Sequence, residues 1–143
     1  MKPTTREWVE KAEGDFRSAG REMRARKSPN YDLCCFCAQQ CGEKYLKALL
    51  QERGQPTPRT HDLPKLLDLL VGDYPELDLL RPRLQALTAF AVEFRYPGAS
   101  ATKTLARQAC RDSGLIRDAL RRLLPLPART ADRTRAGKRH RTR

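Results

Sequence analysis

The chain has 143 residues and a formal net charge of +12, from 29 lysines and arginines against 17 acidic residues. This length fits a single domain with one core that needs no metal or disulfide for its stability. The first residues contain no apolar stretch typical of a signal peptide, and no run of about 18 residues lacks a charge. We therefore expect a cytoplasmic protein that does not span a membrane.

The positive charge is concentrated near the C-terminus. Residues 128–143 contain seven basic side chains and one acidic one, Asp132, so this segment carries +6 and the preceding 127 residues carry the other +6. Since no apolar periodicity recurs beyond Pro127, we expect one domain over residues 1–127 and a disordered basic tail over residues 128–143. Such a tail can add salt-sensitive contacts to phosphates but cannot specify a nucleotide sequence.

Two helices joined by a tight connection are predicted at the N-terminus. Apolar residues recur at helical spacing up to about Lys27, and Thr4 or Thr5 is expected to cap this first helix. Residues 28–30 form the connection, in which Asn30 is expected to cap the second helix. The two helices should therefore form an antiparallel hairpin. The apolar residues of the first helix are Trp8, Ala12, Phe16, Ala19 and Met23.

The second helix, residues 31–51, is predicted to be the central helix because it is apolar on almost every side. Its polar side chains gather in one sector of the helical wheel. This sector fits either ordinary exposure to solvent or a cleft that binds a polar ligand, and the i,i+4 spacing of Glu43 and Lys47 favours solvent exposure. The sector consists of Gln39, Gln40, Glu43, Lys44 and Lys47, with Phe36 and Leu50 among them.

A short helix is predicted over residues 61–71, with Asp62 in its first turn and His61 near its cap, where a local structural role is favoured for both. A longer fourth helix should follow from about Glu76 to Tyr96, and Pro82 marks either a kink or its true start. Heptad spacing along this helix aims Arg95 at or near the interior. There it would either reach outward from the helix end or act as a functional cation in a cleft.

A fifth helix, capped by Ser100 or Thr102, should carry an apolar face as far as Pro125. No segment alternates with period two over a useful length, and no internal repeat is present. The predicted fold is therefore all-α, an up-and-down bundle of four long helices with one short additional helix and the disordered basic tail.

The five cysteines are predicted to be reduced thiols without a metal. Four of them lie on the central helix, where most cannot reach one another in disulfide geometry. Cys34 and Cys41 are separated by about 10.5 Å of helix rise, whereas sulfur ligands of one zinc ion are about 3.8 Å apart. Cys37, Cys41 and Cys110 could approach one ion, but no fourth ligand is evident. We therefore expect small buried thiols at these positions.

Four short strings, taken in order, resemble the HEPN domain family. They are the N-terminal tryptophan with the downstream EGDF, then FCAQQCGEKYLKALL, THDLPKLL and EFRYPG, and the match covers roughly residues 5–124. The resemblance implies a four-helix domain that forms a homodimer, with a cleft between protomers proposed to bind nucleotide or nucleic acid. It also implies a small nucleotidyltransferase partner, in some members as toxin and antitoxin. The family's polar positions fall on Gln40, Glu43, Lys44, His61, Asp62, Arg95 and Tyr96.

The family's ribonuclease branch has an arginine followed, after four to six intervening residues, by a histidine. Counted from Arg95, the allowed positions are Ser100, Ala101 and Thr102, and none is a histidine. This absence matters because metal-free RNA cleavage needs a group that exchanges protons near neutral pH, which a guanidinium does not do. The resemblance therefore implies the non-nuclease branch.

The sequence thus predicts a homodimeric domain that binds a nucleotide or a nucleic-acid phosphate, uses no cofactor and performs no chemistry itself. The basic tail would assist RNA binding, and the domain would serve a small nucleotidyltransferase as substrate presenter or as toxin half. Two alternatives remain: a metal-independent ribonuclease that uses His61 with Arg95, and a purely structural dimerisation module. The predicted cleft is lined by Gln40, Glu43, Lys44, Arg95 and Tyr96.

Overall fold

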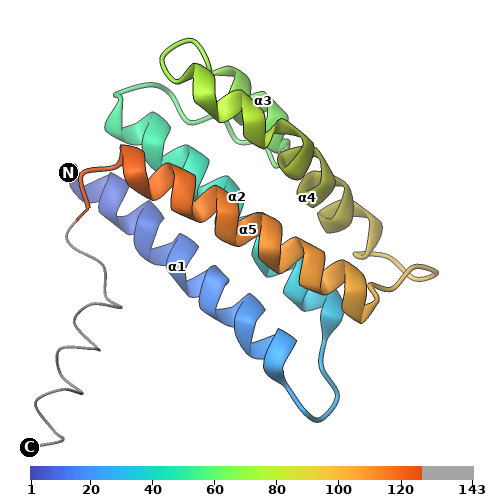
Figure 1. Ribbon diagram of the computed structural model, residues 1–143. Helices are drawn as coiled ribbons and strands as arrows, with labels where there is room; N and C mark the ends of the chain where they lie inside the picture. The colour runs from blue at the N-terminus through green and yellow to red at the C-terminus, as the bar shows by residue number, and fades with distance from the viewer. Residues whose placement is uncertain (127–143) are drawn as a thin grey trace, which may run out of the picture.

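Four long helices, one short helix and one 3-10 turn make up the fold in a computed structural model that describes residues 1–126 (Figure 1). This arrangement confirms the predicted all-α bundle, and residues 1–126 contain no strand. The predicted disordered tail over residues 128–143 lies outside the described residues. The elements are α1 (Pro3–Arg24), α2 (Tyr31–Glu52), α3 (Leu63–Asp68), η1 (Pro75–Leu80), α4 (Arg81–Glu93) and α5 (Lys103–Leu123).

The long helices alternate in direction along the chain. Helices α1 and α2 are antiparallel, because the hydroxyl of Thr5 donates to Glu52 at one end and Glu22 accepts from the Asn30 N–H at the other. Helices α2 and α5 run parallel, since Cys34 contacts Cys110 near their N-terminal ends and the Tyr45 hydroxyl accepts from Arg121 near their C-terminal ends. The topology is therefore up-and-down, as predicted.

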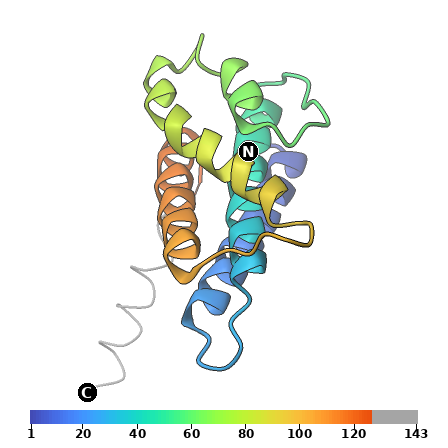
Figure 2. The same cartoon turned by 90° about the vertical axis from the view of Figure 1, so that its right-hand side faces the viewer.

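Helix α2 lies at the centre of the bundle. It packs on α1, α3, α4 and α5, most extensively on α1 and α5 (Figures 1 and 2). The prediction of a central helix is confirmed. Among residues 1–126, no helix combines the length and the apolar composition that a membrane crossing requires. The fully buried side chains of α2 include Cys34, Ala38, Cys41, Tyr45, Leu46 and Leu50.

The start and the end of α1 differ from the prediction. The residue before the helix is Lys2, with Pro3 at the first helical position, and no side chain caps the free N–H groups. Proline is favoured there because it lacks an N–H and has a fixed φ. Thr5, one of the two expected caps, is instead buried inside the helix, with its hydroxyl bonded to Glu52. The helix ends at Arg24, one turn before Lys27.

Three other helices begin at a residue whose side chain caps them. Asn30 accepts a hydrogen bond from the N–H of Leu33, and Thr102 accepts one from Leu105, so both predicted caps are confirmed. Asp62 caps α3 by accepting from the N–H of Lys65, one position earlier than its predicted place in the first turn. Each cap satisfies an N–H group that has no partner within the helix.

The predicted fourth helix is shorter than expected and is divided at Pro82. Residues Pro75–Leu80 form η1, and α4 begins at Arg81 with Pro82 in its first turn. Pro82 therefore marks the true start of the helix, which is the second of its two predicted roles. Helix α4 then ends at Glu93 rather than at Tyr96. Gly98, with φ +103°, turns the chain toward α5 in a conformation that only glycine adopts readily. Arg95 therefore lies in the connection after α4.

Candidate ligand-binding site along helix α2

One face of α2 lies between α1 and α4, which flank it on opposite sides. Both helices pack on α2 and both pack on α5, but α1 and α4 do not form a packed pair with each other (Figure 2). The predicted polar sector of α2 lies along this face. Its residues divide into a buried network around Glu43, a partly exposed pair next to α1, and a pocket near the N-terminal end of α2.

The Glu43 network consists of Glu43, Gln39, Lys47 and His61. The Glu43 carboxylate accepts hydrogen bonds from Nε2 of Gln39 and Nζ of Lys47, both at 3.1 Å, and its Oε1 lies 2.7 Å from Nδ1 of His61. Gln39 also donates to the backbone carbonyl of His61 at 3.3 Å, which fixes the chain before α3 against α2. The Glu43 carboxylate thus connects α2 with the segment just before α3, which is far from Glu43 in the sequence.

The burial of this network contradicts the predicted solvent exposure of the polar sector. The side chains of Glu43 and Lys47 are only 5% and 9% exposed, although they do form the expected i,i+4 pair. The Lys47 ammonium lies 5.6 Å from the ring centre of Trp8 on α1, so α1 covers it. The wheel predicted which residues share a face but not that a neighbouring helix covers them.

Glu43 is charged in this network at neutral pH. Burial alone would raise the pKa of its carboxyl group, but hydrogen bonds from His61, Gln39 and Lys47 together lower that pKa below its ordinary value. His61 is different, because its side chain is 73% exposed while Nδ1 faces Glu43. The carboxylate therefore orients an imidazole whose other edge is open to solvent.

Lys44 and Gln40 lie on the α1 side of the polar sector. The Lys44 ammonium pairs with Asp15 of α1 at 2.5 Å, and both side chains are about one fifth exposed. Gln40 donates to the side-chain oxygen of Gln39 at 2.8 Å, which links it to the Glu43 network. Because Asp15 offsets its charge, Lys44 attracts an added anion less strongly than the sequence suggested.

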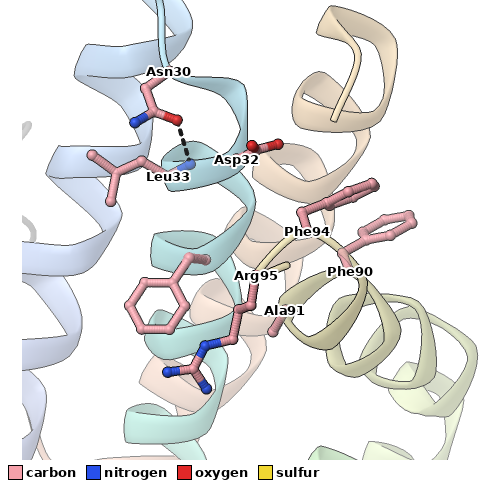
Figure 3. A pocket seen from close by; sticks show the side chains of 8 residues that line it. Asn30, Asp32, Leu33, Phe90, Ala91, Phe94 and Arg95 are labelled. Carbon is pink, nitrogen blue, oxygen red and sulfur yellow. Dashed lines mark hydrogen bonds between the residues drawn. The ribbon is translucent and has the colours of Figure 1, made fainter. Parts of the chain in front are cut away.

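A pocket of about 350 Å³ opens where the chain after α4 approaches the start of α2 (Figure 3). We call it the Arg95 pocket. Figure 3 shows Arg95 reaching from that connection toward α2, with Phe90 and Phe94 next to each other on α4 and just after it. Their ring centres are 6.0 Å apart in a stacked arrangement. The lining residues are Asn30, Asp32, Leu33, Phe36, Phe90, Ala91, Phe94 and Arg95.

Arg95 is exposed, whereas the heptad spacing predicted that it points at or near the interior. The α-helix ends before it, so the heptad spacing that placed it inward no longer applies. Its guanidinium lies 5.7 Å from the ring centre of Phe36 and takes part in no ion pair within residues 1–126. Asp32, the acidic residue of the pocket, instead accepts from the Ala101 N–H at 2.6 Å.

The structure brings only some of the predicted site residues together. Gln40, Glu43 and His61 are connected by hydrogen bonds, and Lys44 is adjacent to them on α2. Phe36, under Arg95, is two turns before Lys44, or about 12 Å along the helix axis. The two cations thus lie along one face of α2 but not in one pocket.

Two predicted residues lie apart from the pocket. Asp62 is an exposed helix cap, and Tyr96 is 69% exposed and does not line the Arg95 pocket. Three aromatic residues that do line it, Phe36, Phe90 and Phe94, were not among the predicted site residues. The sequence did contain a signal for Phe36, because its aromatic ring falls within the polar sector of α2.

Residues 1–126 contain no cluster of three or more His, Cys, Asp or Glu side chains that could hold a metal ion.

The helix order and this face of α2 define an all-α domain that presents a polar and aromatic surface between two of its helices. The sequence model of the HEPN domain matches residues 5–123, and the chain belongs to the HEPN domain family. The resemblance carried by the four short strings is thereby confirmed. No curated protein matches the chain.

Two solved structures share the fold. TT1696 from Thermus thermophilus is 24% identical with a TM-score of 0.75, over 86% of this chain and all of that one. ST0689, described as an archaeal HEPN homologue, is 26% identical with a TM-score of 0.62, over 85% of this chain and 97% of that one. Both superpose over nearly their whole length, so the bundle described here is the complete fold of these relatives.

Proposed function

We propose that this HEPN domain protein binds a nucleotide, or a nucleotide unit of a nucleic acid, on the face of α2 between α1 and α4, and performs no chemistry itself. The observation that carries the proposal is the Arg95 pocket. There an exposed guanidinium without an acidic partner in residues 1–126 lies over Phe36, and the stacked pair Phe90 and Phe94 lines the same pocket. A planar base and a phosphate are the ligand parts that such a pocket fits.

The chemistry of each part follows from its side chains. A guanidinium donates two parallel hydrogen bonds to phosphate oxygens, so Arg95 would hold the phosphate. An accessible aromatic ring stacks on any base, which gives the half-buried Phe36 and the exposed Tyr96, next to Arg95 in the chain, a role without sequence specificity. Gln40 and Lys44 lie farther along α2 and would contact a second phosphate or a neighbouring nucleotide. Asp62 would act indirectly, because it caps α3 and so positions His61.

The assembly belongs to the same proposal and is supported by family membership. We expect a homodimer whose protomers face each other across this surface, in the cytoplasm, with a small nucleotidyltransferase as partner in a toxin–antitoxin pair. The basic tail would add non-specific contacts to RNA. Those contacts should weaken steeply as the salt concentration rises.

Binding of ATP, GTP and a short RNA should be measured by titration calorimetry at low salt. We expect at least one of them to bind, and Arg95→Ala to weaken that binding by about 10- to 150-fold, since one charge-assisted contact is worth about 1.5–3 kcal/mol. The matched control is Arg122→Ala, which removes an exposed arginine of α5 that does not line the pocket. Absence of heat with all three ligands would instead favour a purely structural dimerisation module.

A metal-independent ribonuclease is the second candidate, and one observation favours it. His61 is held by the buried Glu43 at 2.7 Å with most of its ring exposed, which is how a carboxylate orients an imidazole for proton transfer. Labelled RNA should be incubated with the protein in the presence of a metal chelator. We expect no cleavage; cleavage that disappears in both His61→Ala and Arg95→Ala would overturn the binding-only function.

A further inference from the structure

Two cysteines from different helices are in direct contact. The sulfur of Cys34 on α2 lies 3.1 Å from the sulfur of Cys110 on α5. This is only about 1 Å longer than a disulfide bond and is closer than the roughly 3.5–4.0 Å at which core atoms normally pack. The pair was not predicted, because disulfide geometry was considered only within the central helix and Cys110 was expected near Cys37 and Cys41 rather than Cys34.

The two thiols differ in their access to solvent. Cys34 is fully buried, and its sulfur lies near the carbonyl oxygens of Ala19 and Ala106, at 3.4 and 3.8 Å, so α1 and α5 fix its position. Cys110 is partly exposed, whereas the other four cysteines of the chain are buried. A reagent in solution can therefore reach Cys110 first, with Cys34 directly behind it.

The surroundings of Cys110 favour its thiolate. The hydrogen bond with Cys34 lowers the pKa of Cys110 and outweighs the effect of its burial, and the positive charge of Arg24 lowers it further. The same hydrogen bond, together with burial, raises the pKa of Cys34. Arg111, the next residue on α5, is exposed, so an anionic reagent approaches a basic surface.

We propose that Cys34 and Cys110 form a reversible disulfide between α2 and α5 by exchange with a small anionic disulfide such as oxidised glutathione. The Cys110 thiolate attacks one glutathione sulfur, so a mixed disulfide forms and the first glutathione leaves as a thiolate. Cys34 loses its proton and attacks the Cys110 sulfur, and the second glutathione leaves. Two protein thiols are oxidised, one small disulfide is reduced, and the two thiol protons end on the two released glutathiones.

The bond would stabilise the packing of α5 on the central helix. It closes a loop of the chain between residues 34 and 110, which restricts the unfolded state much more than the folded one. The oxidised protein should therefore unfold at a higher denaturant midpoint than the reduced protein. Reduction with dithiothreitol should restore the original midpoint.

The full chain should be incubated with oxidised glutathione, quenched with N-ethylmaleimide and analysed by mass spectrometry. With the quench made in denaturant so that every free thiol reacts, we expect the mass of the chain less two hydrogen atoms plus three maleimide groups and, after trypsin, a linked pair of the peptides 28–44 and 108–111. Because peptide 28–44 contains four cysteines, fragmentation of the linked pair must place the bond on Cys34. This assignment uses the unaltered chain and does not depend on a variant that folds.

Variants provide the matched controls. Cys34→Ala and Cys110→Ala should abolish both the linked peptide and the rise in midpoint, whereas Cys35→Ala, which removes a neighbouring buried thiol of α2, should retain both. The proposal is overturned if Cys110 keeps glutathione as a stable mixed disulfide, if the bond joins Cys110 to Cys35 or Cys37, or if all five thiols are alkylated after oxidation.

Discussion

Replacing Glu13 with alanine is expected to lower the free energy of unfolding by about 2–4 kcal/mol. Glu13 of α1 accepts two parallel hydrogen bonds from Arg117 of α5, at 2.7 and 2.6 Å, and lies 3.5 Å from Arg121. The Arg117 guanidinium also lies 4.7 Å from the ring centre of Phe16. One carboxylate therefore connects the first and the last helix of the bundle.

The large effect follows from removing one partner of a half-buried pair. Burial alone would raise the pKa of Glu13, but hydrogen bonds from Arg117 and the Tyr45 hydroxyl, with the charges of Arg117 and Arg121, lower it below its ordinary value. Without the carboxylate, Arg121 has no acidic partner and Arg117 keeps only the exposed Asp118, at 3.3 Å. The two guanidinium groups, which are 22% and 23% exposed, then keep a partial desolvation cost that Glu13 no longer offsets. The remaining exposure is why we expect less than the loss for a fully buried pair.

Chemical denaturation at pH 7, followed by the fluorescence of the single tryptophan and by circular dichroism, measures this effect. Glu7→Ala, which removes an exposed glutamate of the same helix, should change the free energy of unfolding by less than about 0.5 kcal/mol. The double variant Glu13→Leu with Arg117→Met should recover part of the loss, because it removes the Arg117 charge together with the carboxylate that pairs with it, while Arg121 still lacks Glu13. A loss below about 1 kcal/mol for Glu13→Ala would contradict a structural role of this pair.

Features set by neighbours in the sequence were predicted well. Asn30 and Thr102 are caps because their side chains reach an N–H three residues later, a contact that depends only on local geometry. The central position of α2 followed from apolar residues on nearly all its sides, which only a helix surrounded by others can bury. The antiparallel arrangement of α1 and α2 then followed from the tight connection between them.

Features set by contacts between distant segments were not predictable. His61 reaches Glu43 across 18 residues, Arg117 reaches Glu13 across 104, and Cys110 reaches Cys34 across 76. The same limit explains why the direction of the Arg95 side chain was predicted incorrectly. That direction depends on the residue at which α4 ends rather than on the periodicity before it. Periodicity identifies the face of a helix, but only the assembled bundle determines what covers that face.

Replacing Glu43 with leucine is expected to lower the free energy of unfolding by about 3 kcal/mol, because it leaves the ammonium of Lys47 buried without a carboxylate. Adding Lys47→Met should restore most of the stability, since a flexible apolar side chain packs well against Trp8. In this double variant His61 still lacks the carboxylate that orients it. The double variant therefore separates stability from the orientation of His61, and any ligand binding or RNA cleavage that needs an oriented imidazole should remain impaired in it.

The pH dependence of stability provides an independent measurement of the same network. The pKa of Glu43 in the folded protein is below its ordinary value of 4.5, so the folded state binds fewer protons there than the unfolded state. Its stabilising contribution is then complete above about pH 5.5 and decreases as the pH falls through the lowered folded value. We expect the stability difference between the natural protein and Glu43→Gln to be constant from about pH 5.5 to 7 and to shrink below about pH 4.5. If this stability difference instead stays constant down to pH 3, the Glu43 carboxylate is not stabilised in its charged form by its contacts with Lys47 and His61.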